Sequence, residues 1–278
     1  MSDVDEYKVV TRRRKSNRFF RGVHRLTVAS KEERIEDPDI DLERVRRGIL
    51  AAVNFIEESN YKDILFQGLD EALRLIKAPD LPDIICYGLG NFSQSRAPKF
   101  QLAAVLAIKS RYRSIVYAYD PLFFKPELEI LKELGIQTID TNEEAKRTIE
   151  DRTSLVYMPH CPYQLTNNFI YANWAAKNLL NCLVLSNSFG ELVDSVFSKN
   201  IEHSTNYIDR ISPYTTEIKL KNNFEYEEVF NGSSIHIFSQ ENIDKVPTEF
   251  WDCRKAPIYQ DENCEFVRSS NLSVNLQS

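Results

Sequence analysis

The loop Pro159-His160-Cys161-Pro162-Tyr163 carries the densest reactive chemistry in the sequence. Its imidazole titrates near neutral pH, and its thiol becomes a nucleophile or a metal ligand when its pKa falls. We therefore take His160, Cys161 and Tyr163 as catalytic candidates. Three interpretations stay open: an enzyme with His160 as base or Cys161 as nucleophile, a haem-responsive protein that ligates iron through Cys161, and a loop that only packs.

Glycine is scarce, at eight of 278 residues, yet two glycines form the tripeptide Gly88-Leu89-Gly90. Glycines at this spacing let the backbone turn tightly and approach a ligand. Ser93 stands where a dinucleotide fingerprint has its third glycine, and Asp120 lies more than thirty residues beyond Gly88, where about 20 is usual. An ordinary NAD site is therefore disfavoured. The alternative is a tight turn without a ligand.

Two acids complete the predicted cofactor-binding set of Gly88, Gly90, Asp120 and Asp140. Asp120 ends an apolar run, where a carboxylate can accept two hydrogen bonds from a ribose diol. The alternative is that Asp120-Pro121 only forms a turn. Asp140 follows the next apolar run along the chain.

The elements that must position these residues follow from hydrophobic periodicity. Apolar side chains at spacings of three and four predict amphipathic helices over 42–56 and 65–76. From Asp83 onward, short apolar runs alternate with helical segments. Strands are expected at 84–87, 115–119, 136–139, 154–158 and 182–185. Helices are expected at 100–109, 126–134, 166–178 and 191–197, and another is expected to start at the capping-box pattern Thr141-Asn142-Glu143-Glu144.

Five strands separated by helices predict a Rossmann-like, doubly wound α/β fold with a mostly parallel sheet. Two more strands, at 215–220 and 234–238, have no long helix between them. They predict an antiparallel C-terminal edge, which gives a methyltransferase-like topology. In such sheets ligands bind beyond the carboxyl ends of the strands, so the loops above are expected to meet at one edge.

Composition excludes several classes of protein. The chain is 42% hydrophobic and 27% charged with a net charge of -6, which excludes a disordered tail protein. Its five cysteines form no Cys-x-x-Cys pair, so neither a disulfide framework nor a zinc ribbon is expected, and we predict no metal beyond the weak haem candidate Cys161. No apolar run approaches the ~18 residues of a membrane span, and the acidic N-terminus does not resemble a secretory signal. A cytosolic or nuclear protein is expected.

Three regions are predicted. Residues 1–38 form a basic, flexible arm, residues 39–240 the α/β domain with its two N-terminal helices, and residues 241–278 a C-terminal extension. The arm holds Arg12, Arg13, Arg14, Lys15, Arg18, Arg21 and Arg25. It is either a nuclear-localisation or RNA-contact patch or a solvated arm. The net negative charge of the chain argues against nucleic-acid binding outside this arm.

The same residues carry a family resemblance. The motifs are Tyr87-Gly88-Leu89-Gly90-Asn91, Gln101-Leu102, Asp120-Pro121, Leu134-Gly135, Asn142-Glu143, Tyr157-Met158-Pro159-His160-Cys161-Pro162, Asn173-Trp174 and Ser186-Asn187-Ser188-Phe189. Over about residues 80–240 this order resembles the sensitivity-to-red-light-reduced (SRR-like) family. The resemblance implies a cytoplasmic and nuclear regulatory protein, associated with light input to the circadian clock in plants and with haem biosynthesis and clock-gene expression in animals. It implies no set of catalytic residues.

Three functions are carried forward. The first is a regulatory protein that binds a small ligand, a nucleoside derivative or haem, at the edge holding Gly88, Gly90, Asp120 and His160. The second is an S-adenosylmethionine-dependent methyltransferase. In it the glycines would face the methionine part, Asp120 the ribose, Asp140 the adenine amine and the His160 loop the acceptor. The third is a domain that binds only protein partners.

Overall fold

The computed structural model describes residues 38–196, 203–252, 254–260 and 264–269, all within a unit spanning 37–278. The basic arm predicted for residues 1–38 lies, but for residue 38, outside these ranges. In the described part, a seven-stranded sheet has the order β3-β2-β1-β4-β5-β7-β6. The strands are β1 (Asp83–Tyr87), β2 (Ile115–Tyr119), β3 (Ile136–Thr138), β4 (Ser154–Met158), β5 (Cys182–Asn187), β6 (Thr216–Lys219) and β7 (Ser233–Ile237).

The predicted topology is confirmed. Strands β1 to β5 pair in parallel, and β7 pairs antiparallel with both β5 and β6. The C-terminal edge therefore consists of one reversed strand, β7, followed by β6, which runs in the direction of the first five. An order of 3-2-1-4-5 is that of a doubly wound nucleotide-binding sheet, and the reversed β7 gives the methyltransferase-like variant.

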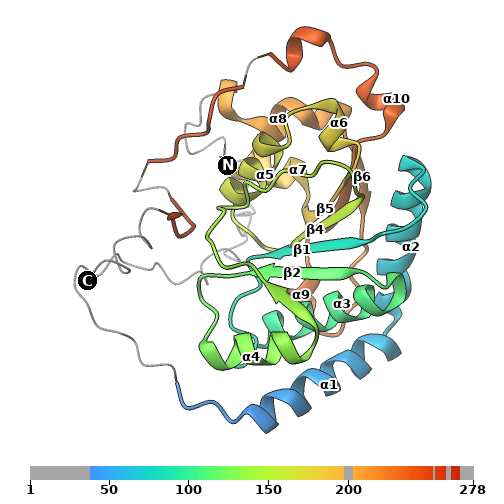
Figure 1. Ribbon diagram of the computed structural model, residues 1–278. Coiled ribbons are helices and arrows are strands. Elements are labelled where there is room, and N and C mark those ends of the chain that lie inside the picture. Colours follow the sequence, from blue (N-terminus) through green and yellow to red (C-terminus); the bar gives the residue numbers. More distant parts are fainter. Residues whose placement is uncertain (1–37, 197–202, 253, 261–263, 270–278) are drawn as a thin grey trace, which may run out of the picture. The chain divides into compact units, whose positions relative to one another are not determined.

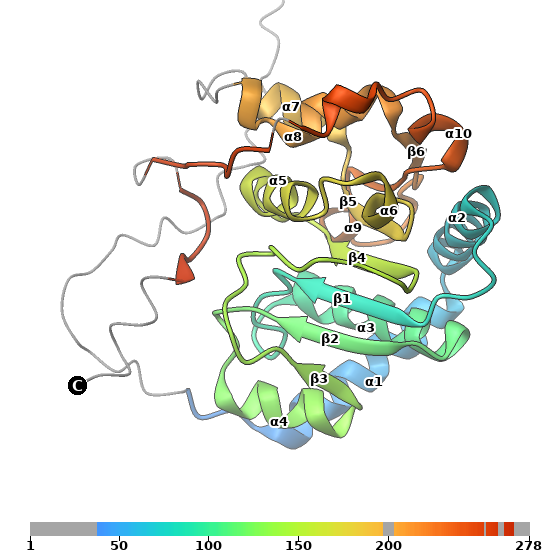
Figure 2. The same ribbon diagram turned by 45° about the horizontal axis from the view of Figure 1, so that its top comes forward.

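Helices cover both faces of the sheet (Figures 1 and 2). One apolar cluster contains residues of α1 (Leu42–Glu58), α2 (Asn60–Ile76), α3 (Arg96–Tyr112), α4 (Lys125–Glu133) and α9 (Glu227–Phe230). The other contains residues of α5 (Tyr163–Ala172), α6 (Ala176–Leu179), α7 (Phe189–Val196), α8 (Tyr207–Ile211) and α10 (Gln240–Ile243). Short 3-10 turns lie at His203–Thr205, Ser212–Tyr214 and Thr248–Phe250.

Side-chain alternation explains the two clusters. In β1, Ile84 and Cys86 belong to the first cluster, whereas Ile85 and Tyr87 belong to the second. All five residues of β1 are buried, because a central parallel strand has both faces covered. The side chains of one strand therefore divide between two separate cores.

The helix predicted from Thr141 was wrong, since residues 139–153 contain no helix. The Asn142 side chain accepts a hydrogen bond from the Glu144 amide at 3.0 Å, and Glu144 and Ala145 take left-handed φ angles of 49° and 58°. Two consecutive residues in that region cannot start a right-handed helix. The asparagine therefore forms a turn rather than a helix start.

The helix predicted over 166–178 is divided into α5 and α6, because Asn173 ends the first helix. Its Nδ2 donates to the carbonyls of Phe169 and Arg147, both at 2.9 Å, while its Oδ1 accepts from the Ile149 amide at 2.7 Å. Asn173 is fully buried. It ties the segment before β4 to the end of α5.

We expect Asn173→Ala to lower the free energy of unfolding by about 2–3 kcal/mol. The Ile149 amide and the Arg147 carbonyl lose their bonds to this side chain, and the Phe169 carbonyl keeps only its bond from the Asn173 backbone amide. Urea denaturation followed by circular dichroism measures this loss. Asn181→Ala is the matched control, since the Asn181 amide also donates to two carbonyls but near the surface. Its expected loss is below about 1 kcal/mol. Equal losses in the two variants would contradict this role of Asn173.

Candidate functional site

The structure places Gly90 and Asp120 in direct contact at the carboxyl edge of the sheet. Asp120 accepts a hydrogen bond from the Gly90 amide at 2.7 Å and another from the Leu122 amide at 2.8 Å. Gly88 and Gly90 both have positive φ angles, 69° and 77°, so this turn uses the conformations that glycine allows. The loops after β1 and β2 are thereby joined.

Asp120 is a buried acid, and its surroundings act on its ionisation in opposite directions. Burial raises the pKa of its carboxyl, the two backbone hydrogen bonds from Leu122 and Gly90 oppose that rise, and the net pKa is raised. The Gly90 N–H that would face a phosphate in a dinucleotide site is already bonded to this carboxyl. The turn therefore does not suit an anionic ligand.

A second buried acid, Glu127 of α4, was missed by the sequence analysis. It is fully buried and accepts from the Ser93 amide at 2.7 Å, from the Phe124 amide at 3.0 Å and from the Asn91 side chain at 3.1 Å. The sequence did contain a signal for this role. Glu127 lies three residues after Phe124, the residue that precedes α4, and a glutamate at that position often caps the start of a helix. Glu127 fixes the loop after β1 against α4.

Cys161 packs directly against Gly88. The thiol donates to the Tyr87 carbonyl at 3.3 Å, and a Cβ on Gly88 would lie only 2.3 Å from its sulfur. Burial, with a smaller effect of the Asp120 charge, raises the pKa of the Cys161 thiol well above its usual value. Nucleophilic attack and iron ligation both need the thiolate. In this setting the Cys161 thiol is protonated and packs against Gly88.

His160 has a left-handed backbone with φ of 57°, held by a hydrogen bond from its amide to the Asn187 side chain at 2.8 Å. Its Nε2 lies 3.1 Å from the Val229 carbonyl, which can only accept, so Nε2 carries the proton. Burial of the ring lowers the pKa of His160, although the Val229 contact opposes this. The ring is neutral near pH 7, and its Nδ1 has the lone pair of a base.

Tyr163 and Asp140 lie apart from this contact network. Tyr163 is buried at the start of α5, and its hydroxyl donates to the Asn206 side chain at 2.5 Å. Burial raises the pKa of Tyr163, so the phenol stays protonated. Asp140 is exposed in the segment after β3. The roles of both as site residues stay predictions.

A polar network beside the edge was also missed. The Tyr87 hydroxyl donates to Glu143 at 2.5 Å, and Arg147 donates to both oxygens of the same carboxyl at 2.9 and 2.7 Å. Burial raises the pKa of Glu143, but the bonds from Arg147 and Tyr87 together outweigh this, and the pKa is lowered. The spacing of four between Glu143 and Arg147 predicts an ion pair only on a helix, and residues 139–153 form none, so it did not identify this network.

Residues near the C-terminus also reach this side of the molecule. The Tyr259 hydroxyl contacts the side chains of Asn167 and Asn168 of α5 at 3.0 and 3.1 Å. The Asn142 amide donates to the Val267 carbonyl at 2.7 Å, and Ser269 donates to Glu144. No periodicity in the sequence indicated these contacts.

Several polar groups of this edge are hydrogen-bonded to one another, namely Asp120 to the amides of Gly90 and Leu122 and Glu127 to the amide of Ser93. One surface hollow of about 570 Å³ lies beside β3 and α4, and another of about 400 Å³ lies beside α1 and α3. None of the candidate site residues lines either hollow. Among the described residues, no three His, Cys, Asp or Glu side chains are grouped to hold a metal ion. No helix in the described part is both long and apolar enough to cross a membrane.

We expect Gly88→Ala to destabilise the protein more than Gly90→Ala. Both alanines would adopt an unfavourable left-handed backbone, at about 1–2 kcal/mol, but only the first would collide with Cys161. The nearest neighbour of a Cβ at Gly90 is Pro98, at an acceptable 3.4 Å. Denaturation of the two variants, and of Gly88→Ala combined with Cys161→Ala, measures the difference. If removing the sulfur recovers none of the loss, the packing argument fails.

We further expect Cys161 to be alkylated far more slowly than Cys264 in the native protein at pH 8. The Cys161 thiol is buried and protonated, whereas Cys264 is partly exposed. Iodoacetamide labelling followed by peptide mass spectrometry compares the two residues, and labelling in urea gives the control in which both react. Comparable native rates would contradict the burial and protonation of the Cys161 thiol.

Residues 67–237 match the family model of the SRR1 domain. The SRR1-like protein of Drosophila melanogaster is 28% identical over 280 residues, which cover 99% of this chain and 98% of the relative. The SRR1-like protein of Mus musculus is 35% identical over 131 residues, 46% of this chain and 53% of that protein. Protein SENSITIVITY TO RED LIGHT REDUCED 1 of Arabidopsis thaliana is 25% identical over 226 residues, 76% of this chain and 82% of that protein.

Among solved structures, the plantazolicin methyltransferase BpumL in complex with a monoazolic desmethylPZN analog and SAH is similar over 72% of this chain and 98% of that one. The sequence identity is 10% and the TM-score is 0.31, so the fold assignment is based on the strand order and not on this likeness. The SRR1 match, in contrast, spans more than half of the sequence. It confirms the resemblance seen in the sequence motifs, and the chain belongs to the SRR1 family.

Proposed function

We propose that this protein is a regulatory protein whose α/β domain binds a phosphate-free nucleoside at the carboxyl edge of the sheet. By analogy with its family, it acts in circadian rhythm input and in the regulation of haem biosynthesis, in the cytoplasm and nucleus and with protein partners. The name of the Arabidopsis relative supports the light-related part. The observation that carries the ligand class is the contact between Asp120 and the Gly90 amide.

This contact selects against phosphate and leaves lone pairs of the Asp120 carboxylate for the hydroxyls of a diol. Each oxygen of the Asp120 carboxylate accepts one backbone N–H, and a carboxylate oxygen has a second lone pair for a further donor. Ribose hydroxyls are such donors. A phosphate in the same place would meet two buried acids, Asp120 and Glu127, and would find the Gly90 N–H already occupied.

The states of the reactive groups favour binding over catalysis. Cys161 is held as a neutral thiol and Tyr163 as a neutral phenol, and both donate to internal acceptors. A nucleophile needs the deprotonated form and an adjacent base. Neither side chain is deprotonated, and each hydroxyl or thiol proton is already donated to an internal acceptor, so neither is prepared to act as a nucleophile.

The same groups do not fit direct haem ligation at this loop. A thiolate ligand would require Cys161 to lose its proton inside a buried pocket beside the Asp120 charge. The Nε2 of His160 is bonded to the Val229 carbonyl. The proposed role in haem biosynthesis is therefore regulatory and does not include iron binding by these residues.

An S-adenosylmethionine-dependent methyltransferase is the alternative. The strand order favours it, and so does the neutral His160, whose Nδ1 could accept a proton from a substrate. In this alternative Gly88 and Gly90 face the methionine part, Asp120 the ribose and Asp140 the adenine amine. The positive sulfonium group would suit the acids beneath the turn.

Isothermal titration of the full chain with adenosine, adenosine monophosphate, S-adenosylmethionine and its demethylated product tests both functions. We expect adenosine to bind more tightly than its monophosphate, and Asp120→Asn to weaken adenosine binding about tenfold, the loss of roughly one hydrogen bond. Asp39→Asn, a change of an exposed acid, is the control and should leave binding unchanged.

The proposal fails if adenosine does not bind, if the monophosphate binds equally well, or if Asp120→Asn has no effect while its thermal unfolding matches that of the parent. Binding of S-adenosylmethionine and its product more than a hundredfold tighter than adenosine would favour the methyltransferase. That outcome would identify the methionine part as a recognised group.

A further inference from the structure

The strand β3 forms one outer edge of the sheet. Among the described strands it pairs only with β2, so its other side presents backbone N–H and C=O groups to the surroundings. Such an edge can pair with a strand of another chain, and many proteins protect it by a covering element. No described element is paired with the outer side of β3.

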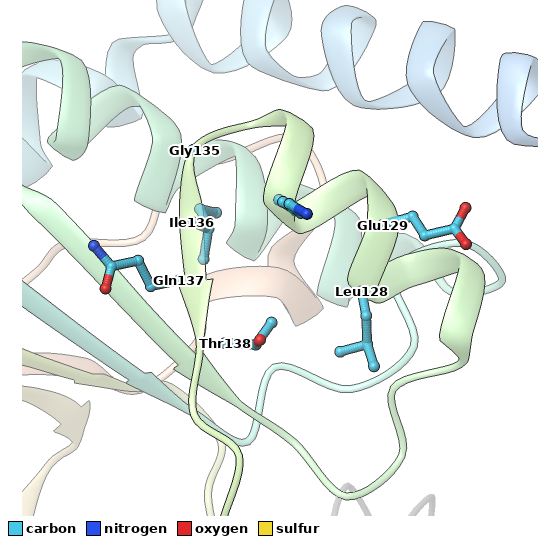
Figure 3. Close-up of a pocket in the computed structure, with 7 residues that line it drawn as sticks. Leu128, Glu129, Gly135, Ile136, Gln137 and Thr138 are labelled. Carbon is cyan, nitrogen blue, oxygen red and sulfur yellow. The ribbon is translucent and has the colours of Figure 1, made fainter.

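A hollow of about 570 Å³ lies along this edge (Figure 3). It is lined by Leu128, Glu129 and Lys132 of α4, by Gly135, and by Ile136, Gln137 and Thr138 of β3. Leu128 is 37% exposed, and Gln137 and Thr138 of β3 are also exposed. The hollow thus combines an apolar side chain with the outer side of β3, which pairs with no described strand.

Two opposite charges border the hollow. Glu129 and Lys132 lie three residues apart on α4, and neither forms an ion pair with another described residue. A partner with charges of one sign would match one of them and repel the other. A surface that presents the same two charges in reverse order would match both.

We propose that this edge binds a second copy of the same chain, with β3 pairing antiparallel to its counterpart around a two-fold axis. An antiparallel two-fold pairing brings the two α4 helices together in opposite directions, because each helix lies beside its own β3. Glu129 of one copy then faces Lys132 of the other, and the reverse pair forms by symmetry. The sheet continues from one copy into the next.

The contact is small. A three-residue strand and a nine-residue helix offer less area than a standard stable interface. We therefore expect a reversible dimer with a dissociation constant in the micromolar range. The inference is independent of the nucleoside site, because none of the site residues lines this hollow.

Sedimentation velocity of the full chain over a concentration series tests the dimer. Glu129→Lys and Lys132→Glu should each weaken dimerisation at least tenfold, since each places like charges across the two-fold axis. The double variant, which exchanges both charges, should restore the parental dissociation constant. Glu58→Lys, an equal change of charge on exposed α1, is the control and should have no effect.

A chain that stays monomeric at hundreds of micromolar overturns the proposal, because another segment or another protein would then cover the edge. A dimer that is indifferent to the single exchanges, or one that the double exchange does not restore, overturns it as well. The exchanged side chains lie on the outer face of α4, and circular dichroism of each variant verifies that the fold is kept.

Discussion

The carboxyl edge of this sheet depends on how two buried carboxylates find their hydrogen bonds. A buried carboxylate is costly unless polar partners surround it, and here the partners are backbone amides of the loop after β1. Asp120 takes the amide of Gly90, and Glu127 takes that of Ser93. The loop is therefore held from two sides, by β2 and by α4, and its shape follows from the need to satisfy these acids.

That arrangement separates this edge from that of a nucleotide-binding enzyme with the same strand order. In a dinucleotide site the glycine-rich turn leaves its N–H groups free for phosphate. Here the protein supplies its own anion to the turn, and Cys161 fills the space above Gly88. The same strand order thus carries a differently bonded turn, so function has to be argued from the site rather than from the fold.

Sequence reasoning predicted the elements that have strong periodicity and failed where side chains compete with the backbone. The five parallel strands and the helices α1 to α3 follow from the pattern of apolar residues, and α4 from the proline in its first turn and the glycine after its end. The expected helix at Thr141 fails because Asn142 and Glu143 bond within and across the loop, and Asn173 divides the next helix for a similar reason.

The candidate site shows the same limit. The adjacency of Gly90 and Asp120 could be predicted, because parallel strands bring their carboxyl ends to one edge. The hydrogen bonds of the two acids could not be predicted, because they depend on which donor lies beside each acid in the folded chain. Glu127 is recognisable only after α4 is placed against the loop. The roles of His160, Cys161 and Tyr163 likewise depend on tertiary partners such as Val229, Tyr87 and Asn206.

The contacts of Tyr259 extend the domain beyond the C-terminal boundary of the family match. The matched SRR1 region ends at residue 237, yet the amides of Asn167 and Asn168, fully buried in α5, bond to a hydroxyl more than twenty residues beyond that point. A chain cut at the family boundary would leave both amides with fewer partners in the interior. The segment that matches the family model is therefore shorter than the segment that supplies hydrogen-bond partners to the buried side chains of the domain.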